Sequence, residues 1–415
     1  MTPFAALGLA PAIARAAQEC GYAAPTPVQS AAIPAALSGR DVLATAQTGS
    51  GKTAAFALPV LQQLQGVPRA APRATRALVL VPTRELASQV GESMRALARH
   101  LAEPPKVAVV FGGVSINPQM MDLRGGAELI VATPGRLLDL ADRNAVRLGG
   151  VAVLVLDEAD RLLEAGFADE LARVLALLPP RRQNLLFSAT FPSALQSLAG
   201  RLLHEPVCIE LAPEPAAARP VVEQHAVEVD EARRTPLLRH MIRTGGWTRV
   251  LVFVATRYAS DHLADKLRRA GIAAAAFHAD ASQGARTRAL AEFKGGRLQV
   301  LVATDLAARG IDVVQLPVVV NYDLPRSALD HLHRIGRTAR AGAGGLAVSF
   351  IGADDEAHFR LIEKRQGCRV ARERIPGFEP GARVAPAAPT SADGGVKGRR
   401  RSKKDKLREA AARGG

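Results

Sequence analysis

Short apolar runs recur along the chain, each bounded by turn residues and separated from the next run by a helix-like segment. In the first half, these runs predict buried strands at residues 42–44, 77–81, 107–111, 129–131, 151–156 and 185–187. In the second half, they predict strands at residues 250–254, 273–277, 300–303, 318–321 and 346–350. Strands that are apolar throughout and alternate with helices are typical of parallel sheets covered on both faces, so we predict an α/β fold.

Two changes in composition divide the chain. Residues 211–220 are rich in Pro and Ala and show no periodicity, which predicts a linker between a first domain at residues 1–210 and a second at residues 221–373. Beyond them, Pro, Gly, Ser and Ala dominate and a basic run follows at 397–406, which predicts a disordered basic tail at residues 374–415. Such a tail either contacts a polyanion or only keeps the protein in solution, and its charge density favours the first.

The charge points to a polyanionic partner. The net charge is +15, and the segment from residue 381 onward carries ten Lys or Arg against three acids, so that segment contributes +7 and the rest +8. RNA, DNA and acidic membrane surfaces all fit this charge. Aromatic residues make up only 4% of the chain, which disfavours recognition by base stacking and favours contacts to the nucleic-acid backbone.

Cysteine usage and hydropathy indicate a cytoplasmic protein. The three cysteines are far apart in sequence, which predicts neither a disulfide framework nor a zinc site and favours a reducing compartment. No apolar run approaches membrane-spanning length. The Ala-rich residues 1–17 lack a basic leader and are broken by Pro3 and Pro11, so we expect them to be part of the folded domain rather than a signal peptide.

The run that follows the first predicted strand has the residues of a phosphate-binding loop: Ala46, Gln47, Thr48, Gly49, Ser50, Gly51, Lys52 and Thr53. The glycines let backbone N–H groups face a phosphate, and the helix start adds partial positive charge. Lys52 would reach the outer phosphates, and Thr53 would offer its hydroxyl to Mg²⁺. Ala46 replaces the first glycine of the usual pattern. A flexible Gly-Ser loop is the alternative, which the preceding strand and the Lys-Thr pair disfavour.

Carboxylates follow the strand predicted at 151–156, in the order Asp157-Glu158-Ala159-Asp160. A carboxylate at a strand end, behind a phosphate loop in the same sheet, is where Mg²⁺ can be held, partly through water, and Asp157 suits that role. Glu158 can polarise a water molecule for attack on the terminal phosphate. Alone, such a tetrapeptide is usually a solvated helix start, but behind this loop and strand the catalytic interpretation is favoured.

An Asp-Glu-Ala-Asp sequence behind such a loop resembles the DEAD-box ATP-dependent RNA helicases of superfamily 2. The resemblance covers about residues 1–370, with the motifs in family order, and it implies two tandem RecA-like domains, ATP with Mg²⁺ as cofactors, and RNA as partner. The sequences at 180–187 and 282–290 are most similar to the bacterial RhlE-like subgroup. Ala279, Ala339 and His331 replace residues that are common in the family, respectively Gly, Gly and Tyr.

The resemblance also assigns roles to residues that would otherwise be unremarkable. Gln29 lies in a segment that resembles the family's Q motif, where its amide matches the edge of adenine; Phe4 is the upstream aromatic of that motif, and Asp305 approaches the ATP ribose. Contacts to RNA are implied for Pro82, Thr83, Arg84, Gly112, Gly113, Thr133, Arg136, His278, Gln283, Arg286, Thr304 and Gly310. Coupling of hydrolysis to strand separation is implied for Asp160, Ser188, Thr190 and His333.

Two arginines complete the catalytic set of Lys52, Asp157 and Glu158. Arg337 and Arg340 lie three residues apart at a predicted helix start, so they would point the same way. In the family they act as arginine fingers that reach the terminal phosphate when the two domains close. Such a finger is worth roughly 10³ to 10⁵ in rate, about 4 to 7 kcal/mol of barrier.

The resemblance thus implies an RNA helicase, expected to be monomeric, that binds single-stranded and duplex RNA largely independently of sequence. It also implies local unwinding of RNA in RNA decay or ribosome assembly, with ribosome precursors or RNA-decay proteins as candidate partners. Two alternatives stay open. One is a DNA translocase with the same two-domain core, which the Q motif and the Asp-Glu-Ala-Asp sequence disfavour. The other is a scaffold that clamps RNA without unwinding it.

Overall fold

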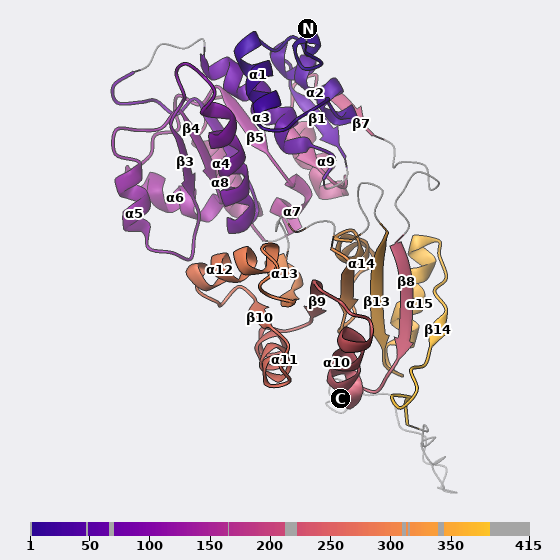
Figure 1. Ribbon diagram of the computed structural model, residues 1–415. Coiled ribbons are helices and arrows are strands. Elements are labelled where there is room, and N and C mark those ends of the chain that lie inside the picture. Colours follow the sequence, from indigo (N-terminus) through magenta and orange to yellow (C-terminus); the bar gives the residue numbers. More distant parts are fainter. Residues whose placement is uncertain are drawn as a thin grey trace, which may run out of the picture.

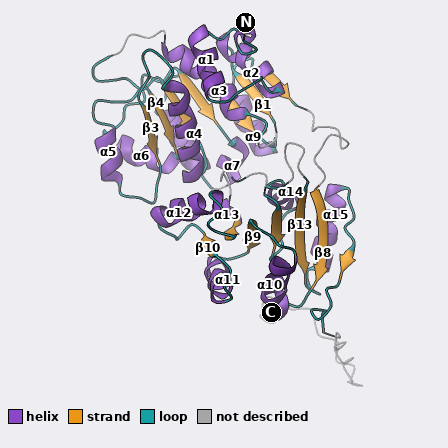
Figure 2. Cartoon of the chain, viewed as in Figure 1, coloured by secondary structure: helices purple, strands orange, loops and turns teal. Residues whose placement is uncertain are grey.

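The computed structural model describes residues 2–46, 49–65, 70–164, 166–211, 222–308, 313, 316–338 and 344–381. They form two α/β lobes that follow one another in sequence (Figure 1). Each lobe contains a seven-stranded sheet in which all pairings of neighbouring strands are parallel. Figure 2 shows the strands of each lobe flanked by helices, which confirms the predicted α/β class.

The sheet of lobe one has the strand order β3-β4-β2-β5-β6-β1-β7. Its strands are β1 (Val42–Thr45), β2 (Ala77–Leu80), β3 (Val107–Val110), β4 (Leu129–Ala132), β5 (Val153–Leu156), β6 (Gln183–Ser188) and β7 (Val207–Glu210). The helices of this lobe are η1 (Ala5–Leu7), α1 (Pro11–Glu19), α2 (Pro27–Leu37), α3 (Lys52–Gln65), α4 (Arg84–Ala98), α5 (Ile116–Asp122), α6 (Pro134–Asp142), α7 (Ala159–Glu164), α8 (Ala168–Ala176) and α9 (Ser193–Leu202).

Alternate residues of the strands in lobe one enter two separate cores. In β2, Ala77 and Val79 pack with residues of α1 to α4, whereas Leu78 and Leu80 pack with residues of α6 to α9. Both faces of the sheet are therefore covered, which explains why these strands are apolar at every position. The residues just beyond the carboxyl ends of the strands are the ones that a parallel sheet makes available for a site.

The sheet of lobe two has the strand order β10-β11-β9-β12-β13-β8-β14. Its strands are β8 (Val222–Glu228), β9 (Val250–Val254), β10 (Ala274–Phe277), β11 (Val300–Thr304), β12 (Val318–Asn321), β13 (Gly345–Ile351) and β14 (Arg372–Glu373). Its helices are η2 (Glu231–Arg233), α10 (Arg234–Thr244), α11 (Arg257–Arg269), α12 (Gln283–Lys294), α13 (Asp305–Ala308), α14 (Ala328–Ile335) and α15 (Glu356–Gln366). Residues of α10 and α11 pack on one face, and residues of α12 and α13 on the other.

All of the predicted strands are present, with ends within two residues of those predicted from the apolar runs. The sequence did not indicate β7, β8 and β14, whose burial patterns include half-buried or exposed positions. β7 and β14 are the edge strands of their sheets, and β8 lies next to β14. The faces of strands near a sheet edge are less fully covered by helices, so fewer of their side chains need to be apolar. Most of the predicted linker and the predicted tail lie outside the described residues.

Among the described residues, side chains of α4 and α7 in lobe one contact side chains of α12 and α14 in lobe two. Arg286 and Gln283 of α12 both contact Glu85 of α4, and His333 of α14 contacts Arg161 of α7. Figure 1 shows these helices facing one another between the lobes. Within the described ranges, no helix is both long enough and apolar enough to cross a bilayer.

Candidate active site

The loop between β1 and α3 is built around two glycines in the left-handed region, Gly49 at φ +84° and Gly51 at φ +96°. A Cβ at Gly51 would lie 2.4 Å from Nε2 of Gln29, so a larger residue would displace that amide. Lys52 is the first residue of α3 and is buried, and its Nζ donates to the carbonyl oxygen of Ala46 across the loop at 2.8 Å. The buried hydroxyl of Ser50 has no hydrogen-bond partner among the residues that the structure describes. Gln47 and Thr48 lie outside the described residues.

Gln29 holds the start of α2 against this loop. Its Oε1 accepts a hydrogen bond from the Thr26 N–H at 3.0 Å, and its Nε2 donates to the Gly51 carbonyl at 3.1 Å. Phe4 is fully buried in the core of lobe one, with its ring edge-on to Tyr22 at 6.4 Å. The structure thus brings Gln29 to the phosphate loop and places Phe4 behind the same segment. Their contacts with adenine remain predictions.

Asp157 and Glu158 follow β5 at the carboxyl edge of the sheet. Both are buried, and Oδ1 of Asp157 accepts from the Glu158 N–H at 2.9 Å. Burial raises the pKa of Asp157 to about 6; the nearby Lys52 ammonium lowers this pKa and the Glu158 carboxylate raises it. A metal ion beside it would hold Asp157 in its ionised form.

Glu158 has a strained backbone, with φ at +51°. A non-glycine residue in this region costs of order 1 to 3 kcal/mol, and such strain persists only where the surroundings impose it. Within the described part of the chain, one buried carboxylate oxygen of Glu158, Oε2, has no hydrogen-bond partner and lies 3.6 Å from Nε of Arg161. A buried carboxylate oxygen with an unused lone pair can accept a proton from a bound water molecule.

Asp160 links the carboxylate turn to the end of β6. Its Oδ2 accepts from the Thr190 hydroxyl at 2.6 Å and from the Thr190 N–H at 3.0 Å. Ser188 closes the arrangement, because its hydroxyl accepts from the Asp160 N–H at 3.3 Å and donates to the Thr190 carbonyl at 2.7 Å. The structure therefore brings together three of the four residues predicted to couple hydrolysis to strand separation.

The fourth, His333, reaches this group from lobe two. Its Nδ1 lies 2.9 Å from Nη2 of Arg161, the residue after Asp160. Burial, reinforced by Arg161, lowers the pKa of His333 to about 4, so at neutral pH the uncharged ring accepts a hydrogen bond from the guanidinium. The sequence did not indicate a role for Arg161; its position three residues after Glu158, in the first turn of α7, was the available signal.

The expectation that Arg337 begins a helix is wrong. Helix α14 ends at Ile335, and the N–H of its C-cap Gly336 bonds to the Leu332 carbonyl, so Arg337 follows a helix end. Glycine is common where helices stop, which the sequence Ile-Gly-Arg signalled. Arg337 is buried, and Arg340 lies outside the described residues. The finger role of both arginines remains a prediction.

Asp305 is bound on both oxygens by Arg334, whose Nε and Nη2 lie 2.6 and 2.7 Å away. Nη1 of the same guanidinium donates to Oδ1 of Asn321 at 3.0 Å, and its plane lies over the ring of Phe253. Bidentate pairs of this kind fix the geometry of the carboxylate. The ribose contact of Asp305 remains a prediction, and the sequence did not single out Arg334 as its partner.

The residues of lobe one predicted to contact RNA form one cluster. Thr83 caps α4 by accepting from the Leu86 N–H at 3.3 Å, and Pro82 precedes it in a buried turn. A Cβ at Gly113 would collide with the guanidinium of Arg84. The Gly112 N–H donates to the Thr133 hydroxyl at 3.4 Å, and Arg136 donates to the Val114 carbonyl at 2.7 Å. These contacts place a guanidinium, a hydroxyl and glycine turns at one edge, where phosphates can be bound.

The corresponding residues of lobe two are placed differently. Nη2 of Arg286 lies 2.8 Å from Oε2 of Glu85, with both side chains buried, and Nε2 of Gln283 donates to Oε1 of Glu85 at 3.4 Å. In this structure these side chains join the lobes, and their contact with RNA remains a prediction. Glu85 itself received no role from the sequence.

The remaining RNA candidates of lobe two follow strands of its sheet. His278 comes directly after β10, and its Nε2 lies 3.0 Å from Oδ1 of Asp261. Thr304 ends β11, and Gly310 lies outside the described residues.

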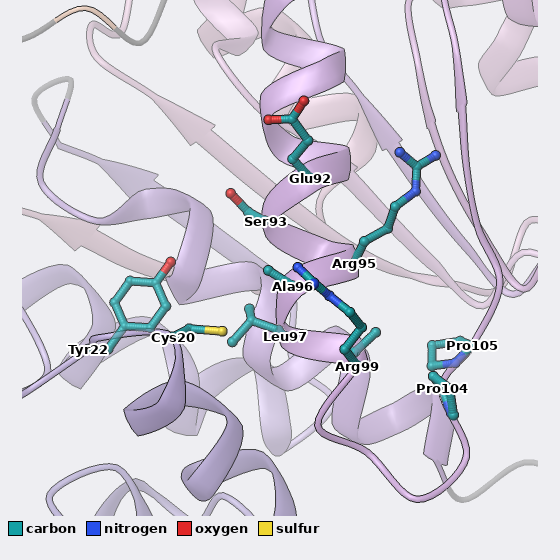
Figure 3. A pocket seen from close by; sticks show the side chains of 11 residues that line it. Cys20, Tyr22, Glu92, Ser93, Arg95, Ala96, Leu97, Arg99, Pro104 and Pro105 are labelled. Atoms are coloured by element: carbon teal, nitrogen blue, oxygen red, sulfur yellow. The ribbon is translucent and has the colours of Figure 1, made fainter. Parts of the chain in front are cut away.

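A surface pocket lies elsewhere on lobe one (Figure 3). It is lined by Cys20, Tyr22, Glu92, Arg99 and Pro104, among others, near the C-terminal ends of α1 and α4. Its lining residues on α4 begin at Glu92, so at 1.5 Å per residue the pocket starts about 10 Å along the helix from Glu85, which faces lobe two. It is therefore separate from the phosphate loop and the carboxylates.

Comparison with known proteins agrees with this site. The model of the DEAD/DEAH box helicase family matches residues 26–198, and that of the helicase conserved C-terminal domain matches residues 233–342. The chain is 43% identical to the ATP-dependent RNA helicase DbpA of Escherichia coli, over 87% of this chain and 78% of that protein. It is 39% identical to the ATP-dependent RNA helicase DeaD of Mycobacterium tuberculosis, over 91% of this chain and 65% of that protein.

Solved structures show the same arrangement of two lobes. S. cerevisiae Dbp5 bound to RNA and ADP BeF3 matches with a TM-score of 0.78 at 30% identity, over 92% of this chain and 96% of that chain. Mss116p bound to ssRNA and AMP-PNP matches with a TM-score of 0.77 at 28% identity, over 88% of this chain and 77% of that chain. The family models, the relatives and the site, with its phosphate loop and its buried Asp157 and Glu158, agree: the chain belongs to the DEAD-box ATP-dependent RNA helicases, which are ATP-hydrolysing enzymes.

Proposed function

We propose that this chain separates RNA duplexes locally and non-processively, and that closure of its two lobes couples hydrolysis of ATP to that separation. The observation that carries the proposal is the path from Glu158 and Asp160 through Arg161 to His333. Because Asp160 also accepts two hydrogen bonds from Thr190, this path joins the carboxylates both to the end of β6 in the same lobe and to the second lobe. A change at the nucleotide would thereby be transmitted to the surface on which RNA would lie.

The donor set fits Mg²⁺. A threonine hydroxyl at the start of α3 and the carboxylate of Asp157 are hard oxygen ligands, and Mg²⁺ usually adds water and phosphate oxygens to one or two such groups. Thr53 and Asp157 would hold the ion, which would neutralise phosphate charge. Glu158 would orient and deprotonate the attacking water, Lys52 would bind the outer phosphates, and Arg337 and Arg340 would stabilise charge on the terminal phosphate.

RNA would be bound through its backbone. Dbp5 and Mss116p, to which this chain is similar, were solved with RNA bound, and the cluster around Arg84 and Arg136 offers donors suited to phosphates. Backbone contacts predict binding that is largely independent of sequence and weakens with salt. We further propose a cytoplasmic, monomeric enzyme of RhlE-like type that acts on ribosome precursors or with RNA-decay proteins; the sequences at 180–187 and 282–290 support the subgroup.

The proposal is tested by steady-state ATPase with single-stranded RNA, duplex RNA and DNA, together with strand separation of a short RNA duplex. RNA should stimulate turnover and DNA should not. Thr190→Val removes the hydroxyl that lies 2.6 Å from Asp160 with little change in shape, so it should reduce unwinding more than ATPase. Thr244→Val, which removes a surface hydroxyl bonded to its own helix, is the matched control. Stimulation by DNA equal to that by RNA would refute the proposal, and RNA-stimulated turnover without any unwinding would favour an RNA clamp.

A further inference from the structure

One exposed face of α11 in lobe two carries chemistry that the ATP site and the proposed RNA path do not use. Tyr258, His262, Lys266 and Arg269 are all exposed and lie four, four and three residues apart. At 3.6 residues per turn, these positions share one face of the helix. We call these four side chains the α11 stripe.

The aromatic end of the α11 stripe is arranged as a platform. Tyr258 is 75% exposed, the highest value among the large hydrophobic side chains of the described residues. Its ring stacks on that of His262 with centroids 5.5 Å apart and planes 14° apart. At this centroid distance the two rings are offset, and the 75% exposure of Tyr258 leaves aromatic surface on which a further flat group can stack. An exposed aromatic ring of this kind offers a surface on which a nucleic-acid base can stack.

The charges around the α11 stripe favour an anion. Three acids on α11 or in the segment before α12 have partners: Asp265 pairs with Arg268, Asp280 pairs with Arg257, and Asp261 lies against His278. By contrast, the side chains of Lys266 and Arg269 have no ion pair or hydrogen-bond partner within the described part of the chain. The aromatic end is therefore followed along the helix by two available cations.

Helix α11 is also tied to the segment that carries His278, a residue predicted to contact RNA. Asp261 and Arg257 tie the first turns of α11 to His278 and Asp280, in the segment that precedes α12. From Tyr258 to Arg269 the helix rises about 16 Å, which is room for a few nucleotides of a single strand.

We propose that the α11 stripe binds the part of a single RNA strand that extends beyond the cleft, with a base stacked on Tyr258 and phosphates on Lys266 and Arg269. This inference rests on the proposed RNA-binding function and adds to it a site outside the two-lobe junction. Stacking is sequence-tolerant because every base has a flat face, and it gains strength from nearby cations.

The test measures the affinity of the full-length chain for two kinds of single RNA strand. One is a short strand that only spans the junction between the lobes, and the other is a longer strand extended at the 5′ or the 3′ end. Loss of one base–aromatic stack of about 1 to 3 kcal/mol corresponds to roughly 5- to 150-fold in affinity, so Tyr258→Ala should weaken binding of one extended strand by that factor. Its affinity for the short strand should stay within about twofold of wild type, and Tyr258→Phe should retain affinity because it keeps the ring.

Two further variants sharpen the test. The double variant Lys266→Ala, Arg269→Ala should reduce the slope of log affinity against log salt by about 1.4, because each phosphate neutralised on a single strand contributes about 0.7 to that slope. Leu361→Ala removes another exposed apolar side chain of lobe two, 60% exposed on α15, and should change neither measurement. Equal affinity of Tyr258→Ala and wild type for both extended strands would overturn this inference while leaving the proposed function intact. Absence of RNA-stimulated turnover in the wild type would instead count against the proposed function.

Discussion

Replacing Arg286 with glutamine is expected to weaken closure of the two lobes by roughly 100-fold. Arg286 of lobe two and Glu85 of lobe one form an ion pair at 2.8 Å in which both side chains are buried. Removing one partner of a buried ion pair costs roughly 3 to 5 kcal/mol, because the other charge is left without compensation. When the lobes separate, water reaches Glu85 and relieves that cost. The penalty therefore falls on the equilibrium between open and closed lobes rather than on folding.

The lower end of this range applies here, because Gln283 still donates to Glu85 at 3.4 Å. A cost of about 3 kcal/mol corresponds to roughly a 100-fold smaller ratio of closed to open molecules. The stacking of Arg286 over Phe277, at 5.0 Å, lies within lobe two and does not change on opening.

Closure can be followed by energy transfer between dyes on the two lobes, with ATP analogue and RNA present. The RNA concentration needed for half-maximal ATPase stimulation should rise in parallel. Arg360→Gln, which removes an exposed pair within α15, should have no effect, since surface pairs contribute about 1 kcal/mol or less. In the double variant Glu85→Gln, Arg286→Gln, closure should recover in part. Unchanged closure and unchanged RNA dependence in Arg286→Gln would refute the reasoning.

Four further outcomes are expected. Lys52→Ala should reduce ATP turnover by at least about 100-fold, because a buried ammonium directed at the phosphate loop is lost, and near-normal turnover would contradict the loop assignment. Glu158→Gln should still bind ATP and RNA but should hydrolyse ATP roughly 10² to 10⁴ times more slowly, and binding assays with single-turnover kinetics would show this. Deleting residues 382–415 should weaken RNA affinity and reduce its dependence on salt, while the ATPase activity measured without RNA should not change. An unchanged salt dependence of RNA affinity would mean that the tail does not contribute to RNA binding. Burial lowers the pKa of His331 to about 4, below its unfolded value of 6.5, so the unfolded chain binds more protons between these pH values and stability falls as pH drops from 6.5 to 4. Between pH 6.5 and pH 4, the melting temperature of His331→Tyr should fall less than that of the wild type. An equal fall in both proteins would argue against the lowered pKa of His331.

The sequence predicted the strands well because buried parallel strands must be apolar at every position, and each run in β2 or β9 fulfils that rule. It predicted the phosphate loop and the carboxylate pair because their chemistry requires particular residues at fixed spacing. It could not predict contacts between distant segments. Nothing local distinguishes Glu85, which binds across the lobes, from an ordinary acid in the first turn of a helix. The backbone strain at Glu158 likewise depends on the packing around it.

The position of β8 has a consequence for dividing the chain into fragments. This strand comes first in lobe two, but it pairs along its whole length with β13, from Gly345↔Val222 to Ile351↔Glu228, and β14 pairs with its outer edge. The region matched by the helicase C-terminal model, residues 233–342, contains none of these three strands. A fragment with those limits would lack the last three strands of its sheet and would expose the unpaired edge of β12, which favours aggregation through strand addition. Autonomous folding of the second lobe therefore requires both the residues just after the linker and those just before the tail.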